Sequence, residues 1–164
     1  MREAKVNELS GSVAGVERAV EVRATRNLRG AVWSKLLVNC SVTTIGAIAG
    51  GTMREYMASP SGSELFNRTY DEALKMALAT GAQPETMLVE PIPPGWRADG
   101  IASEERNTWI TKVLTAYGDV TPSMLQDIRR GRRTEIDFIN GYVVKMARQF
   151  GFDAPINAAI VETV

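Results

Sequence analysis

The sequence contains no histidine and only one cysteine among its 164 residues. Without histidine, the chain cannot build a serine–histidine–aspartate triad, a histidine general base or most known types of zinc and non-haem iron site. Any acid–base chemistry must therefore use lysine, glutamate, aspartate or tyrosine. The single cysteine, Cys40, allows no disulfide within the chain, which predicts a reducing and cytoplasmic location.

The chain also lacks net charge and long apolar runs. Nineteen basic residues balance nineteen acidic ones, so no overall field favours nucleic acid or an anionic membrane as a partner. The N-terminus shows no signal-peptide pattern, and no segment has the roughly 18 apolar residues that a membrane span requires. The sequence has no Gly-x-Gly-x-x-Gly or Walker-type loop, and thus no visible phosphate cradle for a nucleotide.

One long amphipathic segment, residues 29–51, organises the chain. Apolar residues recur there at steps of three and four, which predicts a helix of about five turns with one buried stripe. The residues of this stripe are Trp33, Leu36, Leu37, Cys40, Ala47 and Ile48. Because Cys40 lies on the stripe, we expect it to be a core residue rather than a nucleophile.

A second stripe of the same helix carries Lys35, Asn39 and Thr43, which we call the polar row. These residues lie four positions apart, so they stack on one face of a helix. The lysine can be an ordinary solvated charge. Alternatively, the ammonium and the amide together bind an oxygen-rich small molecule. The spacing alone leaves both interpretations open.

The rest of the chain is mostly helical in pattern. Residues 3–15 are compatible with helix, and residues 20–24 alternate as in a short strand whose pairing partner lies outside this chain. A proline-rich loop is expected over residues 83–100. Further helices are predicted from Thr52 to about Ser59, from Ser61 or Ser63 to Gly81, from near Ser103 to Gly118, from Pro122 (capped by Thr121) to about Arg130, from a Thr134 cap to Gly151, and after Pro155. The pattern predicts an all-α bundle.

Two of these helices have clear inner faces in the sequence. The long helix that ends at Gly81 is expected to bury Leu65, Tyr70, Leu74, Ala77 and Leu78, and the helix that follows Thr134 is expected to bury Ile136, Ile139, Val143, Met146 and Phe150.

Two further polar residues stand near predicted helix starts. Glu135 follows the Thr134 cap, and Asp137 stands in a capping-box-like position. The negative charge of Glu135 would suit the positive end of the helix dipole or orient a lysine ammonium. Ser123 lies in the first turn after Pro122, where its hydroxyl and the backbone amides could receive a carboxylate. The basic cluster 129–133 is expected to be a solvated turn between helices, with contact to an anionic ligand as the alternative.

Several motifs together resemble the C-terminal domain of ketopantoate reductase. They are Trp33-Ser-Lys-Leu-Leu-Val-Asn-Cys40, Ser123-Met-Leu-Gln-Asp127, Arg133-Thr-Glu-Ile-Asp-Phe-Ile-Asn-Gly141 and Ala154-Pro-Ile-Asn157. The resemblance covers roughly residues 4–164. It implies an all-α, multi-helix bundle of the 6-phosphogluconate dehydrogenase C-terminal-domain type, preceded by a short strand that belongs to a Rossmann domain absent from this chain.

The resemblance also implies chemistry. The family reduces 2-dehydropantoate to pantoate with NADPH in pantothenate synthesis, between a nucleotide-binding Rossmann domain and the helical domain. By resemblance, Lys35 matches the general acid and Glu135 the active-site glutamate, whereas Asn39 and Ser123 match substrate-binding residues. Thr43 stands where the family has a second asparagine, a departure that bears on which 2-keto acid is bound.

We therefore expect residues 1–29 to be a remnant of the nucleotide-binding domain and residues 30–164 to form the substrate-binding and dimerisation domain. The expected partners are a 2-keto acid and possibly a second copy of the chain or a separate Rossmann domain, with no nucleic acid and no membrane. NADPH is expected in the complete enzyme but not on this chain alone, which should not catalyse. The alternative is a non-catalytic helical module for dimerisation or interaction.

Overall fold

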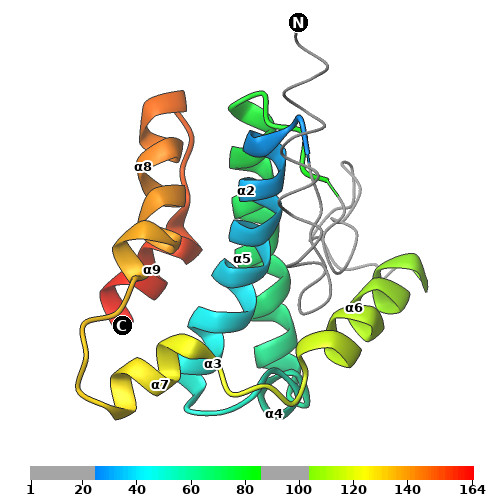
Figure 1. Ribbon diagram of the computed structural model, residues 1–164, viewed down its shortest axis with the longest axis vertical. Helices are drawn as coiled ribbons and strands as arrows, with labels where there is room; N and C mark the ends of the chain where they lie inside the picture. Colours follow the sequence, from blue (N-terminus) through cyan, green and yellow to red (C-terminus); the bar gives the residue numbers. More distant parts are fainter. Residues whose placement is uncertain (1–24, 86–103) are drawn as a thin grey trace, which may run out of the picture.

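The computed structural model describes residues 25–85 and 104–164, and this part of the chain forms a helical bundle (Figure 1). The helices are α2 (Leu28–Val38), the π-helical turn η1 (Asn39–Thr43), α3 (Thr44–Ala49), α4 (Met53–Met57), α5 (Pro60–Ala79), α6 (Glu104–Tyr117), α7 (Ser123–Arg129), the 3-10 turn η2 (Ile136–Phe138), α8 (Asn140–Phe150) and α9 (Pro155–Thr163). The predicted all-α class is confirmed. The predicted helix 3–15, strand 20–24 and most of the predicted loop lie outside the described residues.

Two long helices form the centre of the bundle. The helix made of α2, η1 and α3 runs beside α5, with α8 and α9 on one side and α6 on the other (Figure 1). The α2 helix begins at Asn27, whose side chain accepts the Gly30 N–H at 2.9 Å and donates to the Gln83 carbonyl at 2.8 Å. Gly30 is required at this crossing, because a Cβ there would lie 2.1 Å from the same carbonyl oxygen.

The core follows the predicted stripes with exceptions at their edges. Trp33, Leu37 and Cys40 are buried as expected, and so are most of the inner positions predicted for α5 and α8. Three residues predicted to be buried are instead exposed, namely Ile48 (39%), Leu78 (39%) and Phe150 (46%). Each lies in the last turn of its helix, where the bundle no longer covers the apolar face.

Helix starts shift slightly from the predicted positions because of proline. The α5 helix begins at Pro60, with Ser59 as its cap, rather than at Ser61 or Ser63. Proline suits the first helical position, since its missing N–H would have no partner there. At α7, Pro122 occupies the N-cap position in place of the predicted Thr121, and it makes no side-chain capping hydrogen bond. The prediction that Thr52 caps α4 is confirmed, with a capping box to Glu55.

The long central helix bears on the expectation about membranes. The sequence predicted no segment apolar enough to cross a membrane. Among the described helices, Leu28–Ala49 is nevertheless long and apolar enough by length and composition. In this fold, however, 56% of its most apolar window is buried inside the protein. Such burial is expected for the core helix of a bundle.

Candidate functional site

The polar row lies on the surface side of the central helix. Lys35 is exposed and Asn39 and Thr43 are half-buried, whereas Leu37 and Cys40 between them are fully buried. The sequence alternates apolar and polar residues at helical spacing here, so one side of the helix enters the core and the other keeps its polar groups accessible. The structure thus places all three residues on one accessible strip.

A π-helical turn interrupts the helix at the row. The Thr44 N–H bonds to the Asn39 carbonyl, five residues back, instead of the usual four. In a continuous α-helix, eight residues turn by about 800°, which would displace Thr43 from Lys35 by about 80° around the axis. Each residue of a π turn rotates the helix less. The turn therefore cancels much of this drift and keeps Thr43 more nearly in line with Lys35.

Ser123 lies at the start of α7, which packs beside α3, the C-terminal part of the same central helix. A Cβ on Gly46 would lie 2.5 Å from Cγ of Pro122, so the missing side chain allows the α7 start to approach α3 closely. At the other end of α7, Arg129 donates to the Gly50 carbonyl at 3.0 Å. Both contacts hold α7 along α3, and Ser123 is exposed.

Glu135 occupies a different local structure from the predicted one. It precedes the 3-10 turn Ile136–Phe138 and is not in the first turn of an α-helix, because α8 begins only at Asn140. Thr134 accepts the Ile136 N–H at 3.4 Å, and Asp137 pairs with Arg133 at 3.2 Å, so the predicted capping box does not form. Glu135 is exposed, and within the described residues it makes no ion pair with Lys35.

Two asparagines form a buried polar network that the functional interpretation of the sequence did not include. Asn140 and Asn157 are both fully buried, and Asn140 Nδ2 donates to Asn157 Oδ1 at 2.9 Å. Asn157 Nδ2 donates to Glu72 Oε2 at 2.9 Å and to the Thr69 carbonyl at 3.3 Å. The sequence offers one sign of this network, because each asparagine stands among apolar residues near the start of its helix.

Glu72 completes this network by capping α9. Its carboxylate accepts the backbone N–H groups of Ile156 at 3.0 Å and Asn157 at 2.9 Å, which lie in the first turn of α9. These amides have no partner within their own helix, and a carboxylate suits the positive end of the dipole. The network therefore joins α5, α8 and α9 and extends to the π turn, because Asn140 Nδ2 also donates to the Cys40 carbonyl at 3.3 Å.

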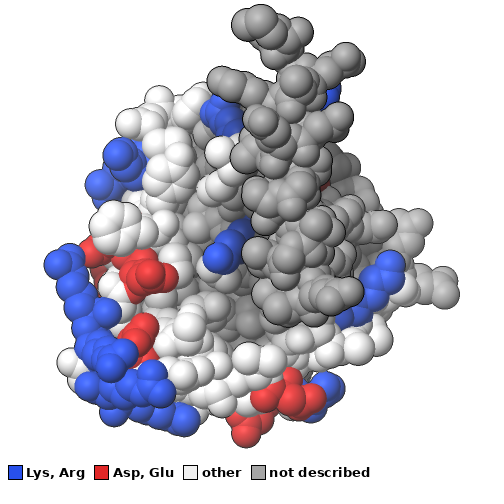
Figure 2. Space-filling model, in the orientation of Figure 1, with Lys and Arg blue, Asp and Glu red and all other residues white. Residues whose placement is uncertain are grey.

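Other groups in the described regions have no evident chemical role. Burial raises the pKa of the Cys40 thiol far above its ordinary value, and this agrees with its predicted place in the core. No group of three possible metal ligands among histidine, cysteine, aspartate and glutamate occurs in the described residues. The arginines of the cluster 129–133 are exposed, and Figure 2 shows basic side chains beside acidic ones over α7 and the segment after it.

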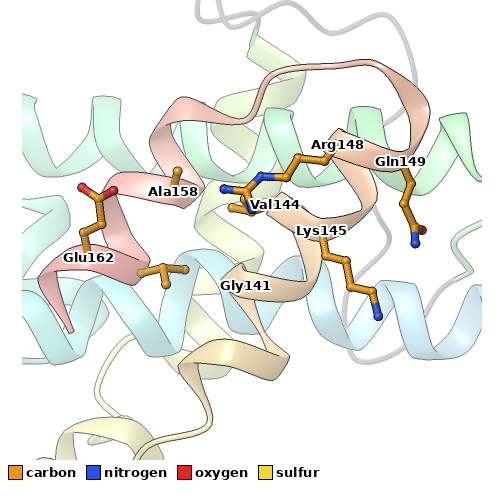
Figure 3. A pocket seen from close by; sticks show the side chains of 8 residues that line it. Gly141, Val144, Lys145, Arg148, Gln149, Ala158 and Glu162 are labelled. Carbon is orange, nitrogen blue, oxygen red and sulfur yellow. The ribbon is translucent and has the colours of Figure 1, made fainter.

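A groove between α8 and α9 lies apart from the polar row. It has a volume of about 390 Å³ and is open to solvent, with Val144, Ala158 and Val161 among its lining residues. Figure 3 shows Arg148 reaching from α8 toward α9, while Lys145 and Gln149 point away from α9. None of the predicted site residues lines this groove.

Comparison with known proteins identifies the family. The family described as ketopantoate reductase PanE/ApbA C terminal matches residues 27–164. This chain belongs to that family. Among curated relatives, it is 29% identical to a 2-dehydropantoate 2-reductase of Archaeoglobus fulgidus, over 97% of this chain and 50% of that protein. It is 31% identical to one of Pyrococcus horikoshii, over 84% of this chain and 40% of that protein.

Solved structures share the fold of this family member. A ketopantoate reductase from Ralstonia eutropha superposes with a TM-score of 0.69 at 23% identity, covering 88% of this chain and 42% of that one. A D-mandelate dehydrogenase with NADH and anilino(oxo)acetate gives 0.73 at 20% identity, covering 99% of this chain and 47% of that one. The ketopantoate reductase family member described here thus spans about half the length of the relatives that it matches.

Proposed function

We propose that this chain is the substrate-binding domain of an NADPH-dependent 2-keto acid reductase, with 2-dehydropantoate as the first candidate substrate. The observation that carries the proposal is the polar row, where an ammonium, an amide and a hydroxyl lie on one accessible strip of the helix. The family match over residues 27–164 supports the same assignment. A 2-keto acid offers carboxylate and carbonyl oxygens to such donors.

The proposed role of Lys35 follows from the chemistry of carbonyl reduction. When hydride adds to the keto carbon, the carbonyl electron pair moves to oxygen, and the resulting alkoxide requires a proton and nearby positive charge. The Lys35 ammonium supplies both, and solvent returns its proton afterwards. In this proposal, Asn39 and Thr43 orient the substrate, Ser123 binds its carboxylate, and Glu135 orients the ammonium in the substrate complex.

The hydride donor requires residues from outside this chain. The sequence contains no Gly-x-Gly-x-x-Gly loop, so nothing in it matches the usual dinucleotide cradle. We therefore assign NADPH to a separate Rossmann domain, residues 1–29 to a remnant of such a domain and residues 30–164 to the substrate domain. A cytoplasmic location belongs to the same proposal, because the sole cysteine is unpaired.

The identity of the 2-keto acid depends on Thr43. Its hydroxyl is shorter than the amide of the family asparagine and presents a different donor set, so we expect the substrate to carry a different or bulkier group at this position. The D-mandelate dehydrogenase with NADH and anilino(oxo)acetate shares this fold. The substrates to compare are therefore 2-dehydropantoate and phenylglyoxylate, the 2-keto acid that corresponds to mandelate.

The decisive experiment joins this chain to the nucleotide-binding half of a relative. Residues 27–164 replace the matching half of the Archaeoglobus fulgidus 2-dehydropantoate 2-reductase, and NADPH oxidation is followed with each 2-keto acid. We expect turnover, and we expect Lys35→Ala to lower kcat by at least ~100-fold, the usual scale of general acid catalysis. Lys112→Ala, which removes an exposed lysine of α6, is the matched control and should keep full activity.

Two results would decide against this function. Turnover that survives Lys35→Ala at neutral pH excludes the assigned acid, and a chimera that folds but reduces neither 2-keto acid excludes the reductase. Calorimetric titration of the chain itself with pantoate and with NADPH, separately and together, adds a direct measurement. Weak pantoate binding without NADPH binding supports a substrate domain that lacks its nucleotide domain.

A non-catalytic dimerisation or interaction module is the second candidate. It is favoured by large apolar side chains exposed on and before α8, namely Phe138 (78%), Tyr142 (37%) and Phe150 (46%). A ketopantoate reductase of Staphylococcus aureus with the same fold is described as dimeric. Sedimentation of the wild-type chain and of Phe138→Ser tests this candidate, because a dimer that uses this face should dissociate in the variant.

A further inference from the structure

Side chains from two other helices donate to the π turn Asn39–Thr43. Asn140 Nδ2 of α8 donates to the Cys40 carbonyl at 3.3 Å, and the Tyr56 hydroxyl of α4 donates to the Ser41 carbonyl at 2.9 Å. Both donors are buried, with 0% and 6% of their surface exposed. A π turn departs from the regular helical hydrogen-bond ladder, so donors from elsewhere that bind its carbonyls stabilise it against the α-helical alternative.

The orientation of the Asn140 amide is dictated from the far end of its network. Glu72 Oε2 can only accept, so Asn157 must turn its Nδ2 toward it and its Oδ1 toward Asn140. Asn140 must then present its own Nδ2 to Asn157, and the same group reaches the Cys40 carbonyl. If the Asn157 amide were reversed, its Oδ1 would face Glu72 Oε2. If the Asn140 amide were reversed, its Oδ1 would face Asn157 Oδ1 and the Cys40 carbonyl. The carboxylate thus fixes Asn140 as a donor to the π turn.

Asn140 also belongs to the segment that carries Glu135. It lies five residues after Glu135, directly beyond the 3-10 turn and Ile139, at the first position of α8. One buried side chain therefore connects the turn that holds Asn39 and Thr43 to the segment that holds Glu135. A site built from side chains on two separate elements needs such a connection to keep its spacing constant.

We propose that Asn140 is the positioning residue of the polar row. Its amide stabilises the π turn, and this turn fixes where Asn39 and Thr43 lie relative to Lys35. The same amide joins the turn to the segment of Glu135. The Tyr56 hydroxyl stabilises the same turn through its hydrogen bond to the Ser41 carbonyl. The inference rests on the proposed function for its catalytic consequence, whereas its structural part is testable on this chain alone.

The first test measures amide hydrogen exchange by NMR in the 164-residue chain. In Asn140→Leu, which removes the donor and keeps the volume similar, the Thr44 N–H should exchange at least ~10-fold faster. Thr80→Val is the matched control, because it also removes a buried hydrogen bond, to the Ala77 carbonyl of α5, and this bond involves neither η1 nor α8. Unchanged Thr44 exchange in Asn140→Leu would overturn the inference.

The second test uses the chimeric reductase at a temperature where every variant is fully folded by circular dichroism. Asn140→Leu and Tyr56→Phe should each lower kcat by ~10-fold or more, whereas KM for NADPH and the activity of Thr80→Val should stay unchanged. An active chimera whose Asn140→Leu variant keeps its kcat overturns the positioning role but leaves the proposed function standing. An inactive wild-type chimera refutes the proposed function, and the Thr44 exchange then decides whether Asn140 holds the turn.

Discussion

The inner and outer polar contacts of this domain differ in what they fix. Inside, Asn140 and Asn157 are fully buried and join α5, α8, α9 and the π turn through hydrogen bonds with defined donors and acceptors. Outside, the pairs Arg54–Asp119 and Arg133–Asp137 connect exposed side chains, more than half of whose surface is open to solvent. The inner contacts specify one arrangement of the helices, whereas the outer contacts only add a little to the stability of that arrangement.

The difference has a simple physical cause. A buried amide that loses its partner keeps the full cost of its desolvation. Asn140 Oδ1 is already buried without a partner among the described residues, so a change of geometry that breaks another hydrogen bond of the inner network is costly. An exposed ion pair that separates regains water, and salt screens it further. The polar row is adjacent to the inner network and not to the outer pairs, so its geometry depends on the contacts that tolerate least change.

The largest effect is expected at Glu72, which accepts hydrogen bonds from two backbone amides and from Asn157. Glu72→Ala removes the acceptor of both backbone amides and leaves Asn157 Nδ2 only the Thr69 carbonyl, and we expect a loss of about 2–4 kcal/mol in the free energy of unfolding. Urea denaturation measures it. Glu64→Ala, at an exposed position of the same helix where Arg68 lies 3.6 Å away, should change little. Equal losses in both variants would abolish the contrast between inside and outside.

An intermediate effect is expected for the pair Arg106–Asp71, which joins α6 to α5 at 3.1 Å with 5% and 18% of the two side chains exposed. Burial raises the pKa of Asp71, and Arg106 only partly opposes this. Arg106→Met should cost about 2–3 kcal/mol at neutral pH, because it leaves a carboxylate in a largely buried place.

This cost should depend on pH. In the folded variant the Asp71 pKa lies above its unfolded value, so the folded state binds the proton more tightly and the free energy of unfolding rises as the pH falls through that pKa. The destabilisation by Arg106→Met should therefore be smaller at about pH 4 than at about pH 7. Urea denaturation at both values measures it, with Lys112→Met as the control on α6. A loss that is independent of pH would show that packing of the arginine stem, not its charge, holds α6.

The smallest effect is expected at the exposed pair Arg54–Asp119, although its geometry is good at 2.7 Å. The pair raises the pKa of Arg54 and lowers that of Asp119, so its attraction is present at neutral pH and is lost as the pH falls through the Asp119 pKa. A double-mutant cycle with alanine at both positions should show weak coupling that vanishes in about 1 M salt. Coupling that persists in salt would place this pair with the inner contacts.

The helical elements could be predicted because their signals are local. Apolar spacing, Thr52 and the glycines at 50 and 151 mark the helices and their ends, and the structure has left-handed backbone at both glycines. The segment of Glu135 was predicted wrongly because Thr134 and Asp137 also suit a capping box. Ile136 and Ile139 are buried as predicted, at 8% and 6% exposure, so burial does not distinguish the two conformations. The backbone leaves helical geometry at Ile139, and α8 therefore begins only at Asn140.

For the candidate site, the sequence determined the row of Lys35, Asn39 and Thr43, because helical spacing is a property of the chain itself. Only the tertiary structure decided how that row is aligned. The π turn depends on where α4 and α8 place Tyr56 and Asn140, and the Asn140 amide is oriented by Glu72, which lies 68 positions earlier in the chain. No local pattern encodes contacts between residues so far apart, since they exist only once the helices have packed.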